Sequence, residues 1–113
     1  MSYKLLPTRR FEKEIKRLVN KFPSLKFEFK ELVATLSDNP ELGTSIGSNC
    51  YKIRLNISSK GKGKRGGARV ITYVYTTGQT LYFLTIYDKS EKADLKPNEL
   101  KTMVSQLDLG DNP

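Results

Sequence analysis

The stretch CYKIRLNISSKGKGKRGGARVITYVY, residues 50–75, decides the fold of this chain. Apolar and polar residues alternate at its beginning, which is typical of a strand with one buried face. The apolar members of this pattern are Tyr51, Ile53, Leu55 and Ile57. A polar, glycine-rich connection follows at Ser58–Gly67. Ala68–Tyr75 is then rich in β-branched and aromatic residues, which predicts a second strand beside the first.

The residues after this stretch extend the sheet and add a helix. Thr76–Thr80 contains a glycine and predicts a turn, and Leu81–Tyr87 predicts a third strand that is apolar on both faces. Pro97 is suited to start a last helix. The apolar residues on one face of that helix are Leu100, Val104 and Leu107.

The residues before this stretch predict a short strand and two helices. Tyr3–Leu6 is a short apolar segment ended by Pro7. Two runs of apolar residues at helical spacing follow, separated by Pro23. The first run is Phe11, Ile15, Leu18, Val19 and Phe22, and the second is Leu25, Phe29, Leu32, Val33 and Leu36. Thr8 and Ser24 are suited to cap the two helices.

The predicted order of elements is β-α-α-β-β-β-α, with residues 41–49 as a loop. This order indicates an α+β fold in which a helical hairpin packs on one face of a small antiparallel sheet. The other face is predicted to stay open, and it carries Lys52 and Arg54 if Ile53 and Leu55 face the helices. At 113 residues the chain has the size of one domain. We assign residues 1–109 to that domain and 110–113 to a frayed tail.

The composition excludes several kinds of chemistry and of location. The chain has no histidine, which excludes a Ser-His-Asp triad, a histidine-based zinc site and a two-histidine ribonuclease mechanism. Its one cysteine, Cys50, is interpreted as a buried, inert thiol, and a single cysteine cannot form a metal cluster. We expect neither a metal nor a cofactor. No apolar stretch approaches the length of a membrane helix, and the N-terminal one is too short for a signal peptide. We therefore expect a cytoplasmic protein without a membrane partner.

The positive charge is concentrated in the centre of the chain. The formal net charge is +8, and residues 50–76 contain seven basic side chains and no acidic one. These are Lys52, Arg54, Lys60, Lys62, Lys64, Arg65 and Arg69. The alternative is a solvated surface, but the complete absence of acids favours a polyanion partner, most often nucleic acid. The sequence GKGKRGG lacks the spacing of a P-loop, so a nucleoside triphosphate is not expected.

The basic residues divide into a strand set and a loop set. Lys52 and Arg54 share one face of a strand about 7 Å apart, a distance that suits neighbouring phosphate or ribose oxygens. Arg69 comes close to them if the two strands pair. The loop set, interleaved with glycines, suits contact with an RNA backbone; it consists of Lys60, Lys62, Lys64 and Arg65. RNA cleavage needs no histidine, because the 2′-OH can attack its own phosphate if another group takes the proton.

Tyrosines on the predicted sheet are further candidates, for base stacking or proton transfer. They are Tyr73, Tyr75, Tyr82 and Tyr87. Ordinary strand packing is the alternative, and we expect it for at least two of them. Tyr87 is the best functional candidate because it ends a strand and is followed by Asp88-Lys89.

At these residues the chain resembles the RelE/HigB-like toxins of bacterial type II toxin–antitoxin systems, in the RelE/ParE superfamily. The helical hairpin ending in L-x-x-N-P at residues 36–40 carries the resemblance weakly. The segments GKRGGARV at 63–70 and LTIYDKSEKADL at 84–95 carry it more specifically. The resemblance implies two helices against a small sheet and a metal-independent endoribonuclease that cuts mRNA in the ribosomal A site. It also implies contact with 16S rRNA, a cognate antitoxin, and operator DNA bound only through the antitoxin complex.

The resemblance also implies roles for single residues. The family's basic pair matches Lys52 and Arg54, and its arginine that steadies the scissile phosphate matches Arg69. Lys89 matches a basic residue after the last strand, and Lys92 is assigned to RNA binding. The best-studied branch has an arginine directly after that lysine and a tyrosine near the C-terminal helix. Those places hold Ser90 and approximately Lys96 here. The proton carrier therefore stays open among Tyr87, Lys52 and Lys64.

Three alternatives fit parts of this pattern. A ParE-like gyrase inhibitor shares the scaffold but does not need Lys52, Arg54 and Arg69 on one face. A non-catalytic RNA-binding module would keep the charge and tolerate conservative replacement of any one basic residue. A DNA-binding repressor is disfavoured because no helix-turn-helix with a basic recognition helix is evident.

Overall fold

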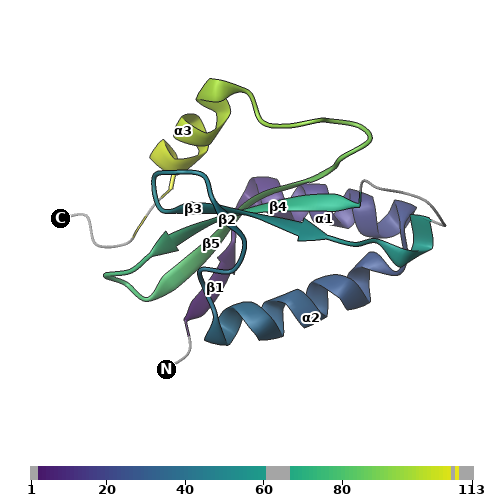
Figure 1. The fold of residues 1–113 in the computed structure, drawn as a ribbon, viewed down its shortest axis with the longest axis horizontal. Coiled ribbons are helices and arrows are strands. Elements are labelled where there is room, and N and C mark those ends of the chain that lie inside the picture. The colour runs from purple at the N-terminus through teal and green to yellow at the C-terminus, as the bar shows by residue number, and fades with distance from the viewer. Residues whose placement is uncertain (1–2, 61–66, 108, 110–113) are drawn as a thin grey trace.

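The computed structural model describes residues 3–60, 67–107 and 109. They form a mixed sheet with strand order β1-β5-β4-β3-β2 and helices on both faces (Figure 1). The strands are β1 (Lys4–Pro7), β2 (Thr44–Ser45), β3 (Cys50–Leu55), β4 (Ala68–Tyr75) and β5 (Thr80–Asp88). The helices are α1 (Arg9–Lys21), α2 (Leu25–Asp38), α3 (Pro97–Ser105) and the short 3-10 helix η1 (Ser58–Lys60). In this part of the chain, no helix combines the length and the hydropathy that a bilayer crossing requires.

The α+β class and the predicted helices are confirmed, except that α3 ends at Ser105, so Leu107 lies beyond the helix. The Thr8 hydroxyl accepts a hydrogen bond from the amide of Phe11 at 3.2 Å and donates one to the carbonyl of Phe83 at 3.0 Å. It therefore caps α1 and ties the helix start to β5. Ser24 differs from the prediction, because its side chain donates to Glu28 at 3.1 Å instead of capping the backbone of α2.

Two predictions about the sheet are wrong. β1 pairs with β5 in parallel, with Lys4 opposite Thr80, so the sheet is not purely antiparallel. The predicted loop at 41–49 contains β2, which pairs antiparallel with β3. Alternation along a strand indicates which face is buried, whereas it carries no information about the strand that lies beside it. A two-residue edge strand also has too few residues to show any period.

The prediction that the other face of the sheet stays open is wrong where α3 covers it. Helices α1 and α2 cover one face, where Phe11, Phe29 and Phe83 stack with ring centroids 5.0–5.4 Å apart. Helix α3 lies on the opposite side (Figure 1), where its Met103 packs with residues of the central strands. That second cluster is Cys50, Ile71, Leu84, Tyr87 and Met103. β5 is apolar on both faces because both are covered at this end.

Cys50 lies in this second cluster and is fully buried. Burial raises the pKa of its thiol to about 11. The thiol therefore stays protonated at neutral pH and is not a nucleophile.

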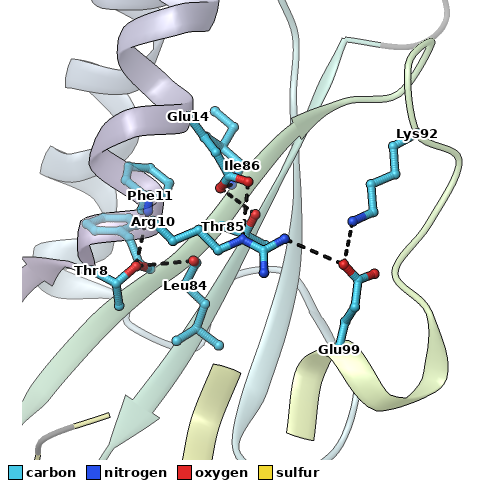
Figure 2. A network of polar contacts seen from close by, with 10 residues as sticks. Thr8, Arg10, Phe11, Glu14, Leu84, Thr85, Ile86, Lys92 and Glu99 are labelled. Atoms are coloured by element: carbon cyan, nitrogen blue, oxygen red, sulfur yellow. Dashed lines mark hydrogen bonds and ion pairs between the residues drawn. The ribbon is translucent and has the colours of Figure 1, made fainter. Parts of the chain in front are cut away.

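A network of hydrogen bonds and ion pairs joins α1, β5 and the first turn of α3 (Figure 2). Glu14 accepts a 2.6 Å hydrogen bond from the hydroxyl of Thr85 and one from the amide of Ile86. Glu99, in the first turn of α3, pairs with Lys92 at 2.7 Å and with Arg10 at 3.5 Å. The Lys92 hydrogen bond, followed by the amide of Lys96, lowers the pKa of the Glu99 carboxyl to about 2.

Glu99→Gln is expected to lower the melting temperature at pH 7 by about 4 °C, or about 1 kcal/mol. Glutamine keeps the hydrogen bond to the amide of Lys96 and removes only the charge. A carboxyl whose pKa is lowered on folding adds stability above its unfolded pKa and loses it as the pH falls through the folded value. The gap between wild type and variant should therefore close between pH 4.5 and pH 2. Thermal melts across this range measure it.

Glu31→Gln is the matched control, because Glu31 is an exposed residue in the middle of α2, away from the helix ends. Its melting temperature should equal that of wild type. A gap for Glu99→Gln that stays constant down to pH 2 would contradict an origin in the carboxylate charge.

Candidate RNA-binding and cleavage site

Four of the five residues predicted to be catalytic line one hollow of about 330 Å³. They are Lys52, Arg54, Arg69 and Lys89, and the remaining wall is Gly43 and Thr44. The hollow lies on the sheet face opposite α1 and α2, beside the area that α3 covers. The structure thus brings together residues that lie as far apart in the sequence as β3 and the end of β5.

The strand register explains how these side chains meet. Ile53 is buried under α1 and α2, so its neighbours Lys52 and Arg54 point to the other face of β3. Arg54 lies directly opposite Arg69 on β4, and Arg69 lies directly opposite Tyr87 on β5. Directly opposite residues of antiparallel strands share a face with Cβ atoms about 5 Å apart. Arg54, Arg69 and Tyr87 therefore form one row across the sheet.

Arg69 is the most enclosed of the basic residues in the hollow, with 8% of its surface exposed. Its guanidinium donates a hydrogen bond to the carbonyl of Ala68 at 3.2 Å. A guanidinium presents several donors in a fixed plane and stays charged, which suits it to hold a phosphate. The position on a central strand gives it less freedom than a loop residue has.

The rim of the hollow depends on Gly43, which sequence reasoning placed in an ordinary loop. Gly43 has φ +105°, and a Cβ there would lie 2.7 Å from the carbonyl oxygen of Lys52. Only glycine permits this close approach of the residue before β2 to β3. Gly43 and Thr44 thereby form a wall next to Lys52.

Tyr87 lies under the same face, with 6% of its surface exposed. Its hydroxyl donates a hydrogen bond to Oδ1 of Asp94 at 3.3 Å, and Lys92 Nζ lies 5.6 Å from the ring centroid. Burial is the main cause that raises the pKa of Tyr87 to about 12, and the Asp94 charge adds to it while Arg69 opposes it. Tyr87 is therefore a neutral phenol that can donate a proton but is a poor base.

Sequence reasoning missed Asp94. Its Oδ1 also accepts from Lys52 Nζ at 3.4 Å and from the amide of Leu95 at 2.9 Å. The hydrogen bond from Leu95 is the main cause that lowers the pKa of the Asp94 carboxyl. The available signal was the second of two acids inside the motif K-S-E-K-A-D-L, and that pattern does not reveal where either side chain lies.

The segment between β5 and α3 is fastened at several points. Glu91 pairs with Arg17 at 2.7 Å and with Lys21 at 2.9 Å, both on α1. Lys89 Nζ donates to the carbonyl of Ala93 at 2.7 Å. The hydrogen bond from Arg17 is the main cause that lowers the pKa of the Glu91 carboxyl. These contacts fix the path of residues 89–94 over the basic face.

The residues predicted to bind RNA are only partly described. Lys92 is in the ion pair with Glu99 and lies beside Tyr87, at the edge of the site. Lys60 ends η1, and its side chain is outside the described part of the chain. The predictions for Lys62, Lys64 and Arg65 also lie outside the described residues. Among the residues that are described, no group of three histidine, cysteine or acidic side chains is placed to hold a metal ion.

Comparison with known proteins matches residues 4–107 to the family described as "RelE toxin of RelE / RelB toxin-antitoxin system". A double mutant of the E. coli toxin RelE in the free state has a similar structure, with a TM-score of 0.62 and 20% identity, covering 82% of this chain and 90% of that one. The intact E. coli RelBE toxin–antitoxin complex gives 0.58 and 19%, covering 75% and 94%. The RelE mutant bound to a RelB antitoxin peptide gives 0.53 and 22%, covering 96% and 100%. At these identities the solved structures show a shared fold.

Proposed function

This chain belongs to the RelE toxin family, and from that premise we propose that it is an endoribonuclease that cuts mRNA in the ribosomal A site. One observation carries the proposal. Lys52, Arg54, Arg69 and Lys89 converge on a single hollow of about 330 Å³. Four cations around one hollow are unfavourable unless an anion occupies it, and a phosphodiester supplies that anion.

The proposed reaction is attack of the ribose 2′-OH on the adjacent phosphorus. The bond from phosphorus to the 5′ oxygen of the next nucleotide breaks, which leaves a 2′,3′-cyclic phosphate and a 5′-OH. Negative charge grows on the phosphoryl oxygens in the transition state, and fixed cations stabilise that charge more than they stabilise the ground state. Arg69 and Arg54 are assigned this role, and Lys89 supports it from the end of β5.

Two proton movements complete the reaction. The 2′-OH must lose a proton, and the departing 5′ oxygen must gain one. We assign the second step to Tyr87, because a buried phenol with a raised pKa keeps its proton until the leaving group takes it. Lys52 is the candidate that accepts the 2′-OH proton, which it can do only as a neutral amine and not as the ammonium paired with Asp94. The reaction as proposed uses no metal ion.

The proposed direct partners all bind at the same hollow or on the basic face around it. Ribosome-bound mRNA occupies the hollow, and 16S rRNA contacts the basic surface around it. A cognate antitoxin covers the basic face in the resting cell, and operator DNA is bound only through that complex. A cytoplasmic location accompanies these partners.

The test is a cleavage reaction with purified ribosomes, a defined mRNA and the purified chain. Mapping the 5′ ends of the products should reveal cuts within the A-site codon, and free mRNA should stay intact. Lys52→Ala and Arg54→Ala should each lower the rate at least tenfold. Lys30→Ala is the matched control, because Lys30 is an exposed lysine on α2, which covers the other face of the sheet.

A gyrase supercoiling assay distinguishes the ParE-like alternative, which is inhibition of gyrase, from the proposed cleavage of mRNA. Intact mRNA together with inhibited gyrase would overturn the proposal. Undiminished cleavage by Lys52→Ala and Arg54→Ala would leave the activity standing but overturn the site.

A further inference from the structure

On the basic face, the carboxylate of Asp94 lies between Lys52 and Tyr87. Oδ1 of Asp94 accepts a hydrogen bond from the ammonium of Lys52 at 3.4 Å and another from the hydroxyl of Tyr87 at 3.3 Å. Lys52 comes from β3 and Tyr87 from β5, so two donors from different strands converge on one anionic oxygen. That oxygen marks a position where this surface binds negative charge.

We propose that the Asp94 carboxylate is an internal anion that occupies a phosphate-oxygen position between Lys52 and Tyr87, and that RNA displaces it on binding. The inference rests on the proposed function only in taking RNA as the ligand of the hollow. It adds that the chain carries its own competitor for the RNA phosphate, the carboxylate of Asp94.

The contacts of the Asp94 side chain are weak enough for RNA to displace it. Charge-assisted hydrogen bonds are usually 2.7–2.9 Å long, and both side-chain contacts of Asp94 are longer than that. The Asp94 side chain is 62% exposed, and an exposed ion pair contributes about 0–1 kcal/mol. A phosphodiester that also contacts Arg54 and Arg69 forms more interactions than the carboxylate does, so it wins the competition.

The segment that carries Asp94 is held by shorter contacts than the Asp94 side chain is. Glu91 is fastened to α1 by two ion pairs at 2.7 and 2.9 Å, and the carbonyl of Ala93 accepts from Lys89 at 2.7 Å. Displacement therefore needs only rotation of the Asp94 side chain and no movement of the segment. The contact occupies the site when RNA is absent and gives way without unfolding.

Removing the Asp94 charge should strengthen RNA binding. Asp94→Asn keeps the shape and the hydrogen bond from the amide of Leu95, and it leaves the ammonium of Lys52 without its counter-charge. We expect it to bind a short fluorescent single-stranded RNA about three- to fivefold more tightly than wild type in 0.15 M salt. Fluorescence anisotropy without ribosomes measures this affinity, so the result does not depend on cleavage.

Two comparisons isolate the contact with Lys52. Glu31→Gln makes the same charge change on α2, which covers the other face of the sheet, and screening over about 8 Å should keep its effect below 1.5-fold. In a Lys52→Ala background, Asp94→Asn should give a smaller gain than it gives in wild type, because the pair with Lys52 is already broken and only the Tyr87 contact remains.

The outcomes separate this inference from the proposed function. Equal gains in Asp94→Asn and Glu31→Gln, or a gain from Asp94→Asn that is undiminished in the Lys52→Ala background, would overturn the displacement. Weaker binding by Asp94→Asn would also overturn it, because the carboxylate would then contribute to the RNA site instead of competing with RNA. If the variants behave as expected while ribosomes with wild-type protein yield no cleavage, the proposed function fails and the internal anion stands.

Discussion

Arg69→Gln is expected to lower the rate of mRNA cleavage on the ribosome by about 100- to 1,000-fold, the loss typical of removing one fixed donor from a developing anion. Arg69 is the enclosed cation in the hollow, and its neighbours across the strands are Arg54 and Tyr87. Charge near the scissile phosphate is worth more where water is largely excluded. Single-turnover cleavage with saturating protein measures the chemical step apart from binding.

Arg69→Lys distinguishes charge from geometry. Lysine keeps one positive charge but lacks the planar set of donors, so we expect a loss of about 30- to 100-fold. Arg9→Gln, at an exposed position of α1, is the matched control and should cleave at the wild-type rate. Melting temperatures must be compared, because Arg69 lies in a central strand. Wild-type rates for a folded Arg69→Gln protein would contradict the assigned role.

Much of the basic hollow could be predicted from the sequence, for a physical reason. Alternation fixes the face of each side chain on a strand. Burial of Ile53 was therefore enough to place Lys52 and Arg54 on the opposite face. Arg69 joined them because a hairpin pairing was the simplest connection of the two strands, and the register has Arg54 opposite Arg69.

The parts that were missed depend on contacts between distant segments. The parallel pairing of β1 with β5 is a choice among partners that no local pattern encodes. Helix α3 has an apolar face of the usual spacing, but the pattern does not state which side of the sheet that face covers. Asp94 belongs to the same class, because its place beside Lys52 depends on how Glu91 fastens the segment to α1. The proposal that Tyr87 is the proton donor likewise rests on its burial and contacts, which only the folded chain supplies.

Tyr87→Phe is expected to lower the cleavage rate about 100-fold while leaving RNA affinity within twofold of wild type. A positioned general acid typically contributes 10²–10⁴-fold. Phenylalanine keeps the ring that packs against Met103 and beneath Lys92, and it removes only the hydroxyl. Tyr73→Phe is the matched control, because Tyr73 packs on the same side of the sheet but pairs with Tyr82 and Cys50, away from the hollow. It should cleave as wild type does.

The pH behaviour tests why this tyrosine acts as an acid. Burial and the Asp94 charge raise its pKa from 10 to about 12, so the phenol stays protonated well above pH 10. The difference in phenolate absorbance between wild type and Tyr87→Phe should therefore titrate near pH 12, provided that circular dichroism shows both proteins folded. Because the shift is upward, the stability that depends on the neutral phenol is lost between pH 10 and about 12. A midpoint at or below pH 10 would show a phenol that ionises readily, and the role of Tyr87 would then shift from donating a proton to accepting one.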